Sequence, residues 1–202
     1  MTADKLRDII SVTDYGLKTQ YDIVELNKTV SEIIKKREYS GVLKAFDELL
    51  EAAGTDAAGK LADRQQRVEE ISEELTRSRI EIMKEARLLQ QLRFTNDVYA
   101  ARIGDEIKEA QRYCDEEKPA LEDQIRKRIY QLTTSKVVAE NFSAQRKLSE
   151  DNCIGMAEKI WNALVTIVPL LRSSISLKTG ENVIIQTKML ISESMKQIEE
   201  KP

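Results

Sequence analysis

A seven-residue repeat of mostly apolar side chains runs through the middle of this 202-residue chain. The repeat positions are Leu61, Val68, Leu75, Ile82, Leu89, Asn96, Ile103 and Ala110. A heptad repeat keeps one side of an α-helix turned toward a partner helix. A helix of roughly 55 residues, at about 1.5 Å per residue, is far longer than an ordinary globular core requires. The sequence therefore predicts a long helix that pairs with another helix along its length.

A second apolar stripe of similar length follows a short polar segment that contains a proline. We predict two antiparallel helices, residues 60–114 and 119–178, joined by a turn at residues 115–119. Pro119 fits the first turn of the second helix, where an N–H group would have no partner in the helix.

Nearly equal helix lengths also predict which residues face each other. Pairing about Glu117 places the region of Val138 opposite Asn96. Pro169 falls inside the second long helix, and we expect a kink there because proline removes one hydrogen bond and clashes with the preceding turn.

Shorter apolar patterns flank this central region. Residues 1–59 predict a helix at about 4–37 and a short helix at 42–50, followed by a linker at 54–59; residues 181–202 predict a last helix. Short helices can reach only the base of a long hairpin. The predicted fold class is therefore all-α: an elongated antiparallel helical hairpin or coiled coil with a helical bundle at its base.

The composition excludes several classes of function. The chain has 35 acidic and 32 basic residues, which are interspersed, whereas nucleic-acid binding calls for a one-sided basic surface. It has no histidine, which removes the commonest general base and most zinc sites. We therefore predict no catalytic, cofactor-binding or metal-binding residues and no nucleic-acid partner.

Two local patterns have residue types that occur in binding sites. The segment from Gly54 to Lys60 is similar in spacing to a phosphate-binding loop, but Leu61 stands where that loop needs Ser or Thr, and helix-forming residues precede it. We interpret it as a linker between helices. Glu69, Glu70, Glu73 and Glu74 could bind a hard cation, but such runs are more typical of a solvated helix face.

Several single residues also have two interpretations. Cys114 and Cys153 are predicted to be free thiols that serve packing, as expected in a reducing compartment. Trp161 and Tyr99 are predicted to lie in the core. Arg172 could meet an anion, although a surface salt bridge is the commoner outcome.

Asn96 is the one amide in the heptad positions. A buried amide there would fix the register of the paired helices, because slipped pairings leave it without hydrogen bonds. The alternative is that Asn96 is simply exposed, and the sequence alone leaves both interpretations open.

The sequence predicts a cytoplasmic protein. Residues 1–20 alternate charged and apolar side chains, unlike a secretory signal. The longest apolar stretch, residues 160–171, contains Asn162, Thr166 and Pro169 and is shorter than a membrane-spanning helix. We expect any membrane contact to be peripheral.

Two stretches resemble the toxic anion resistance family of TelA-like tellurite-resistance proteins. The first combines Asp14-Tyr-Gly-Leu-Lys-Thr-Gln20 with Ser40-Gly-Val-Leu-Lys-Ala-Phe-Asp-Glu-Leu-Leu50. The second combines Ser149-Glu-Asp-Asn152 with Thr166-Ile-Val-Pro-Leu-Leu-Arg172 and Gln186. The resemblance implies a role in bacterial resistance to tellurite or to cell-envelope stress, and it transfers no catalytic residue to this chain.

The sequence therefore predicts a non-enzymatic helical scaffold that presents its surfaces to protein partners or to further copies of itself. The alternative is a small enzyme, or a metal- or oxyanion-binding protein, that acts on the toxic anion through Cys114 or Cys153.

Overall fold

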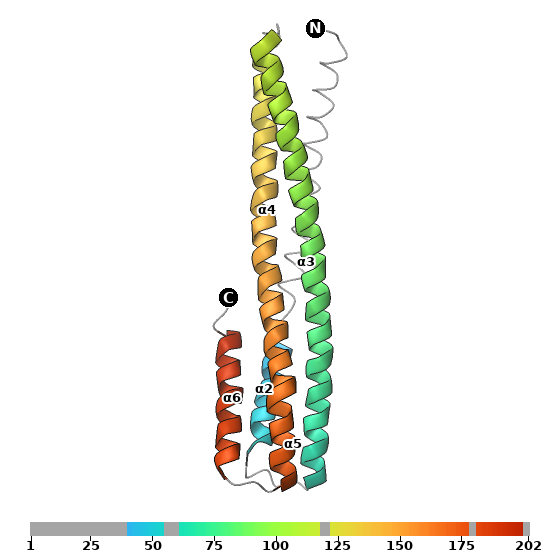
Figure 1. The fold of residues 1–202 in the computed structure, drawn as a ribbon, viewed down its shortest axis with the longest axis vertical. Helices are drawn as coiled ribbons and strands as arrows, with labels where there is room; N and C mark the ends of the chain where they lie inside the picture. The colour runs from blue at the N-terminus through green and yellow to red at the C-terminus, as the bar shows by residue number, and fades with distance from the viewer. Residues whose placement is uncertain (1–39, 55–60, 118–121, 178–180, 200–202) are drawn as a thin grey trace. The chain divides into compact units, whose positions relative to one another are not determined.

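A computed structural model of the chain describes residues 40–54, 61–117, 122–177 and 181–199, and every regular element within them is helical. The elements, in chain order, are α2 (Ser40–Ala52), α3 (Leu61–Glu117), α4 (Glu122–Asn162), the π-helical segment η1 (Ala163–Ile167), α5 (Val168–Leu177) and α6 (Glu181–Glu199) (Figure 1). The all-α prediction is confirmed. The predicted helix at 4–37, most of the linker and the proline of the predicted turn lie outside the described residues.

The chain divides into two compact units. Unit 1 contains Leu88–Leu148, and unit 2 contains Glu38–Arg87 together with Ser149–Pro202. Each unit is described on its own below.

In unit 1, parts of α3 and α4 face each other in antiparallel order. Arg146 Nη1 donates a hydrogen bond to the Leu92 carbonyl oxygen at 2.8 Å, and Arg126 lies 3.4 Å from Asp115. Between these contacts the two helices share an apolar cluster of buried residues, which comprises Ile103, Ile107, Ala110, Tyr113, Cys114, Ile125, Ile129 and Leu132. This cluster and a smaller one around Ala100 and Ala139 are part of the core of unit 1.

The register of this pairing differs from the prediction. Ser143 donates to the Asp97 carboxylate, so the residues opposite Asn96 lie about five positions beyond Val138, or about one and a half helical turns. The cause is the helix end: α3 continues to Glu117, whereas we predicted a turn from residue 115. Glutamate favours helix, and α3 ends shortly before Pro119, whose ring disfavours helical backbone in the residue before it.

The buried face of α3 follows the heptad only in part. All repeat positions from Val68 to Ala110 are buried, as predicted. In unit 1 the residues four positions after the repeat, Ala100, Ile107 and Cys114, are also buried, and so is Tyr113, three positions after Ala110. A broader apolar face of this kind is typical of bundle helices.

Unit 2 is a helical bundle built around large apolar side chains. Phe46 and Leu49 of α2 are fully buried, as are Leu75 of α3, Ile160 of α4 and Ile191 of α6. Helix α6 packs against α2, α5 and η1 (Figure 1). The predicted packing of short helices into a bundle is therefore confirmed for α2 and α6.

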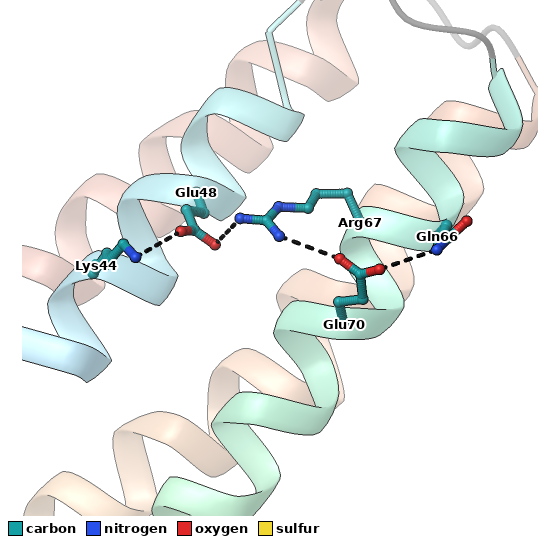
Figure 2. A network of polar contacts seen from close by, with 5 residues as sticks. All are labelled: Lys44, Glu48, Gln66, Arg67 and Glu70. Atoms are coloured by element: carbon teal, nitrogen blue, oxygen red, sulfur yellow. Dashed lines mark hydrogen bonds and ion pairs between the residues drawn. The ribbon is translucent and has the colours of Figure 1, made fainter.

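Polar contacts attach α2 to α3. Figure 2 shows Glu48 of α2 between Lys44 and Arg67, with the Arg67–Glu48 ion pair at 2.7 Å. Arg67 also contacts Glu70 at 3.2 Å, and Gln66 donates to the same carboxylate at 3.1 Å. Except for Glu48, these charged side chains are at least half exposed, so the buried apolar side chains of α2 carry most of the attachment.

A side chain of α3 caps the C-terminal end of α2. Arg64 of α3 donates to the carbonyl oxygens of Ala52 and Gly54, at 2.7 and 3.0 Å, which satisfies acceptors that a helix end leaves open. At Gly54 an added Cβ would lie only 3.0 Å from the Glu51 carbonyl oxygen, so glycine suits this close approach.

The helix departs from α-helical hydrogen bonding just before Pro169, in the π-helical segment η1, and the kink expected there stays a prediction. The N–H of Val168 donates to the carbonyl of Ala163, five residues earlier, instead of to Leu164. Pro169 has no N–H to donate to Val165. The wider turn accommodates the proline ring, and π-helical segments are rare and often lie at functional sites.

Candidate functional site

A buried polar layer interrupts the packing of unit 1. Asn96 is 1% exposed and Arg146 is 3% exposed, and Ser143 beside them is also buried. The Asn96 Nδ2 group has no hydrogen-bond partner within the part of the chain that the structure describes. Of the two interpretations of Asn96, burial is therefore correct, and the register role remains a prediction.

Arg146 is the unexpected member of this layer. Burial lowers the pKa of its guanidinium, because the low-dielectric surroundings disfavour the charged form. Two residues further on, the apolar side chain of Leu148 is 64% exposed. The antiparallel contact with the Leu92 carbonyl places Arg146, instead of Leu148, toward α3.

Both cysteines are free and buried, as predicted. Burial raises the pKa of the Cys114 thiol above its ordinary value, and this effect outweighs the opposing charge of Arg126. A reactive cysteine needs the opposite environment, with thiolate stabilised and accessible. Cys114 therefore lacks the surroundings of a nucleophile.

The acidic side chains near the start of α3 make ordinary surface contacts. Glu69 pairs with Arg172 at 2.5 Å, and Glu70 belongs to the network of Figure 2. Among the described residues, no group of three or more acidic or cysteine side chains is arranged to hold a metal ion. Arg172 makes a surface salt bridge, the commoner of the two outcomes.

Of the loop-like segment that begins at Gly54, only Gly54 itself is described. Its N–H donates to the Glu51 carbonyl oxygen at 2.9 Å, which closes the end of α2. Residues 55–60, which we interpret as a linker, lie outside the described residues.

One surface feature of unit 2 is a row of exposed apolar side chains along the junction of α4, η1 and α5. We call it the Trp161 stripe, and it consists of Trp161, Val165, Pro169 and Leu170. Trp161 is 49% exposed, so its predicted place in the core was wrong; Tyr99, by contrast, packs in unit 1 against Ala100 and Ala139.

The stripe has ordered surroundings. The Arg79 guanidinium lies over the Trp161 ring, 4.7 Å from its centre, a cation–π contact that holds the indole in place. Glu158 is exposed one turn before Trp161, and Arg172 is exposed shortly after Pro169. Acidic and basic groups therefore flank the two ends of an apolar surface.

The same region is strongly apolar overall. The continuous helical stretch Glu122–Ile175 contains an 18-residue window with a mean hydropathy of 1.4, which meets the length and composition of a membrane span. The prediction that any membrane contact is peripheral stays a prediction. The core helix of a bundle meets the same criterion, and 39% of this window is buried.

No protein-family model, curated protein or solved structure matches the chain. The candidate site is therefore defined by its own side chains: the Trp161 stripe in unit 2, with the buried polar layer in unit 1 as a second unusual feature.

The sequence analysis singled out Asn96 but missed the burial of Arg146 and the exposure of Trp161. The sequence does contain a signal for the exposure of Trp161. Val165 and Pro169 follow it at spacings of four and eight residues, which places the three side chains on one helix face, next to the buried face that contains Ile160 and Ile167. Nothing in the local sequence distinguishes Arg146 from its exposed basic neighbours.

Proposed function

We propose that this chain is a non-enzymatic helical scaffold that binds protein partners through the Trp161 stripe. The observation that supports the proposal is the exposure of Trp161, Val165 and Pro169, which are spaced four residues apart along the junction of α4, η1 and α5. Aromatic side chains are enriched at protein interfaces, and helix faces with anchors spaced by four residues suit a partner helix.

The charges around the stripe favour protein over nucleic acid. The Glu69–Arg172 ion pair and exposed Glu158 give the rim both signs of charge. A polyanion would instead require a surplus of basic side chains. We propose that the heptad helices form a coiled-coil-like support for this surface and that the protein works in the cytoplasm.

We further propose that the cellular role is resistance to tellurite or envelope stress, as the resemblance to the toxic anion resistance family implies. Part of that resemblance, Thr166 to Arg172, coincides with η1, α5 and the Trp161 stripe. A deletion strain should grow poorly on tellurite, and expression of the intact chain should restore growth.

Photo-crosslinking tests the scaffold proposal. A benzoylphenylalanine residue at position 161, in the tagged chain expressed in its native cells, should give discrete protein adducts. The same residue at position 94 of unit 1, where Phe94 is 69% exposed, is the control and should give fewer. Equal labelling at the two positions, or no protein adducts at either, contradicts the proposal.

The enzyme alternative makes a different prediction. If the chain reduces tellurite through its thiols, then purified protein with a suitable reductant should turn tellurite over, and Cys114→Ala/Cys153→Ala should not. The buried state of both thiols argues against this outcome. Cysteine-dependent turnover would replace the scaffold proposal with an enzymatic one.

A further inference from the structure

We infer that the Trp161 stripe pairs with the Trp161 stripe of a second copy of this chain, in antiparallel orientation about Val165. The inference rests on the proposed scaffold function and names its partner. It is carried by the order of residues along the exposed face of α4, η1 and α5.

The stripe is self-complementary when reversed. Trp161 lies four residues before Val165, and Pro169 lies four residues after it. A twofold axis at Val165 therefore brings Trp161 of each copy against Pro169 of the other. A flat indole and a proline ring pack well as apolar surfaces, and the Arg79 contact already orients the indole.

The charges at the ends select the antiparallel orientation. Glu158 lies seven residues before Val165 and Arg172 seven residues after it, about two helical turns on either side. Both side chains are exposed. In the antiparallel pair each Glu158 approaches an Arg172, which also pairs with Glu69 of its own chain, whereas a parallel pair would bring the two Glu158 carboxylates together.

The π-helical segment adds polar groups to the centre of the contact. Val168 donates to Ala163 and Pro169 has no N–H, so the carbonyl oxygens of Leu164 and Val165 lack their usual α-helical donors. Donors of a second copy, such as the indole N–H of Trp161, would lie near these acceptors in the antiparallel arrangement.

A membrane surface is the competing occupant, since the region meets the composition of a membrane span. Interfacial helices on anionic membranes carry mainly basic side chains beside the apolar face. Here Glu158 and Glu69 lie beside it as well. This mixed rim favours a protein surface with the same mixture of charges, which a second copy supplies.

Analytical ultracentrifugation of the purified full chain over a wide concentration range tests the inference. The intact chain should dimerise, and Val165→Arg should raise the dissociation constant at least about tenfold, because it places two like charges at the twofold axis. The matched control is Val137→Arg in unit 1, since Val137 and Val165 are both 47% exposed. The control should change the dissociation constant less than about twofold.

A charge exchange tests the orientation. Glu158→Arg should weaken the dimer at low salt, and Glu158→Arg combined with Arg172→Glu should restore much of the lost affinity. Circular dichroism checks that each variant keeps its helix content. Weakening without restoration in the double variant contradicts the antiparallel pairing.

Three results overturn the inference: a monomer at every concentration, equal effects of the two valine variants, or binding to phosphatidylglycerol-containing vesicles by a chain that stays monomeric. If the purified chain is monomeric while position 161 still crosslinks another protein in cells, the second-copy inference fails and the scaffold proposal stands. If neither the crosslinking nor the ultracentrifugation gives the expected result, both the scaffold proposal and the second-copy inference are wrong.

Discussion

Replacing Asn96 with leucine should stabilise the protein and loosen the register of α3 against α4. The amide is 1% exposed, and its Nδ2 group lacks a hydrogen-bond partner among the described residues. A buried donor left unsatisfied costs about 1–3 kcal/mol. The larger leucine will strain the packing to some extent, which offsets part of this gain.

We therefore expect Asn96→Leu to raise the free energy of unfolding by about 1–2 kcal/mol, which corresponds to a rise in Tm of about 2–8 °C for a chain of this size. Thermal denaturation followed by circular dichroism measures it. The control is Gln90→Leu, an exposed position on the same helix, which should stay within about 0.5 kcal/mol of the parent.

Cysteine trapping measures the register in a background without Cys114 and Cys153. Cysteines at positions 97 and 143 should crosslink readily in the parent, because these side chains are hydrogen-bonded to each other. In Asn96→Leu this crosslink should weaken, and one between positions 97 and 136, a heptad away, should appear. A lower Tm would show that the amide is satisfied, and an unchanged crosslinking pattern would refute its role in register.

Three further outcomes are expected. Phe46→Ala should lower the free energy of unfolding by about 3–5 kcal/mol, whereas Arg67→Ala should lower it by less than about 1 kcal/mol. Urea titrations measure both changes, and similar losses would contradict the conclusion that apolar side chains hold α2 in place. Because folding raises the pKa of Cys114 above 9.0, the unfolded chain releases this proton first, so stability should fall as the pH rises above about 9, and Cys114→Ala should fall less steeply. Equal slopes for parent and variant would remove Cys114 as a cause. Pro169→Ala restores a donor for the Val165 carbonyl and should raise stability by about 1–3 kcal/mol, with new protection of residue 169 in amide exchange; an unprotected amide would mean that η1 persists without the proline.

The helices were predictable because their signals are local. Heptad spacing set the extent of α3, and a short apolar group set α2, since both patterns depend only on which residues share a helix face. The structure changed mainly the ends: α3 continues through Asp115 and Glu116, where three consecutive acidic residues suggested a turn but favour helix equally well.

The side chains of the candidate site were less predictable because their burial depends on the partner helix. A shift of about five residues in register decides whether Val138 or Ser143 faces the region of Asn96. The same shift buries Arg146 and exposes Leu148, against their usual preferences. Trp161 was assigned to the core from residue type alone, and only the packing of Ile160 and Ile167 revealed which face of the helix was already occupied.

The wide turn at η1 has a consequence for how this chain tolerates insertions and deletions. A π-helical turn contains one residue more than the α-helical turn it replaces, so the faces of α4 and α5 keep their directions only because that extra residue is taken up there. Deleting the exposed Thr166 should convert the segment to regular α-helix with little rotation of α5. Deleting exposed Ala144 from within α4 would instead turn every later residue by about 100° and carry Ile160 and Leu171 out of the core. During evolution this fold should therefore tolerate the deletion of one residue at η1 but not elsewhere along the helix.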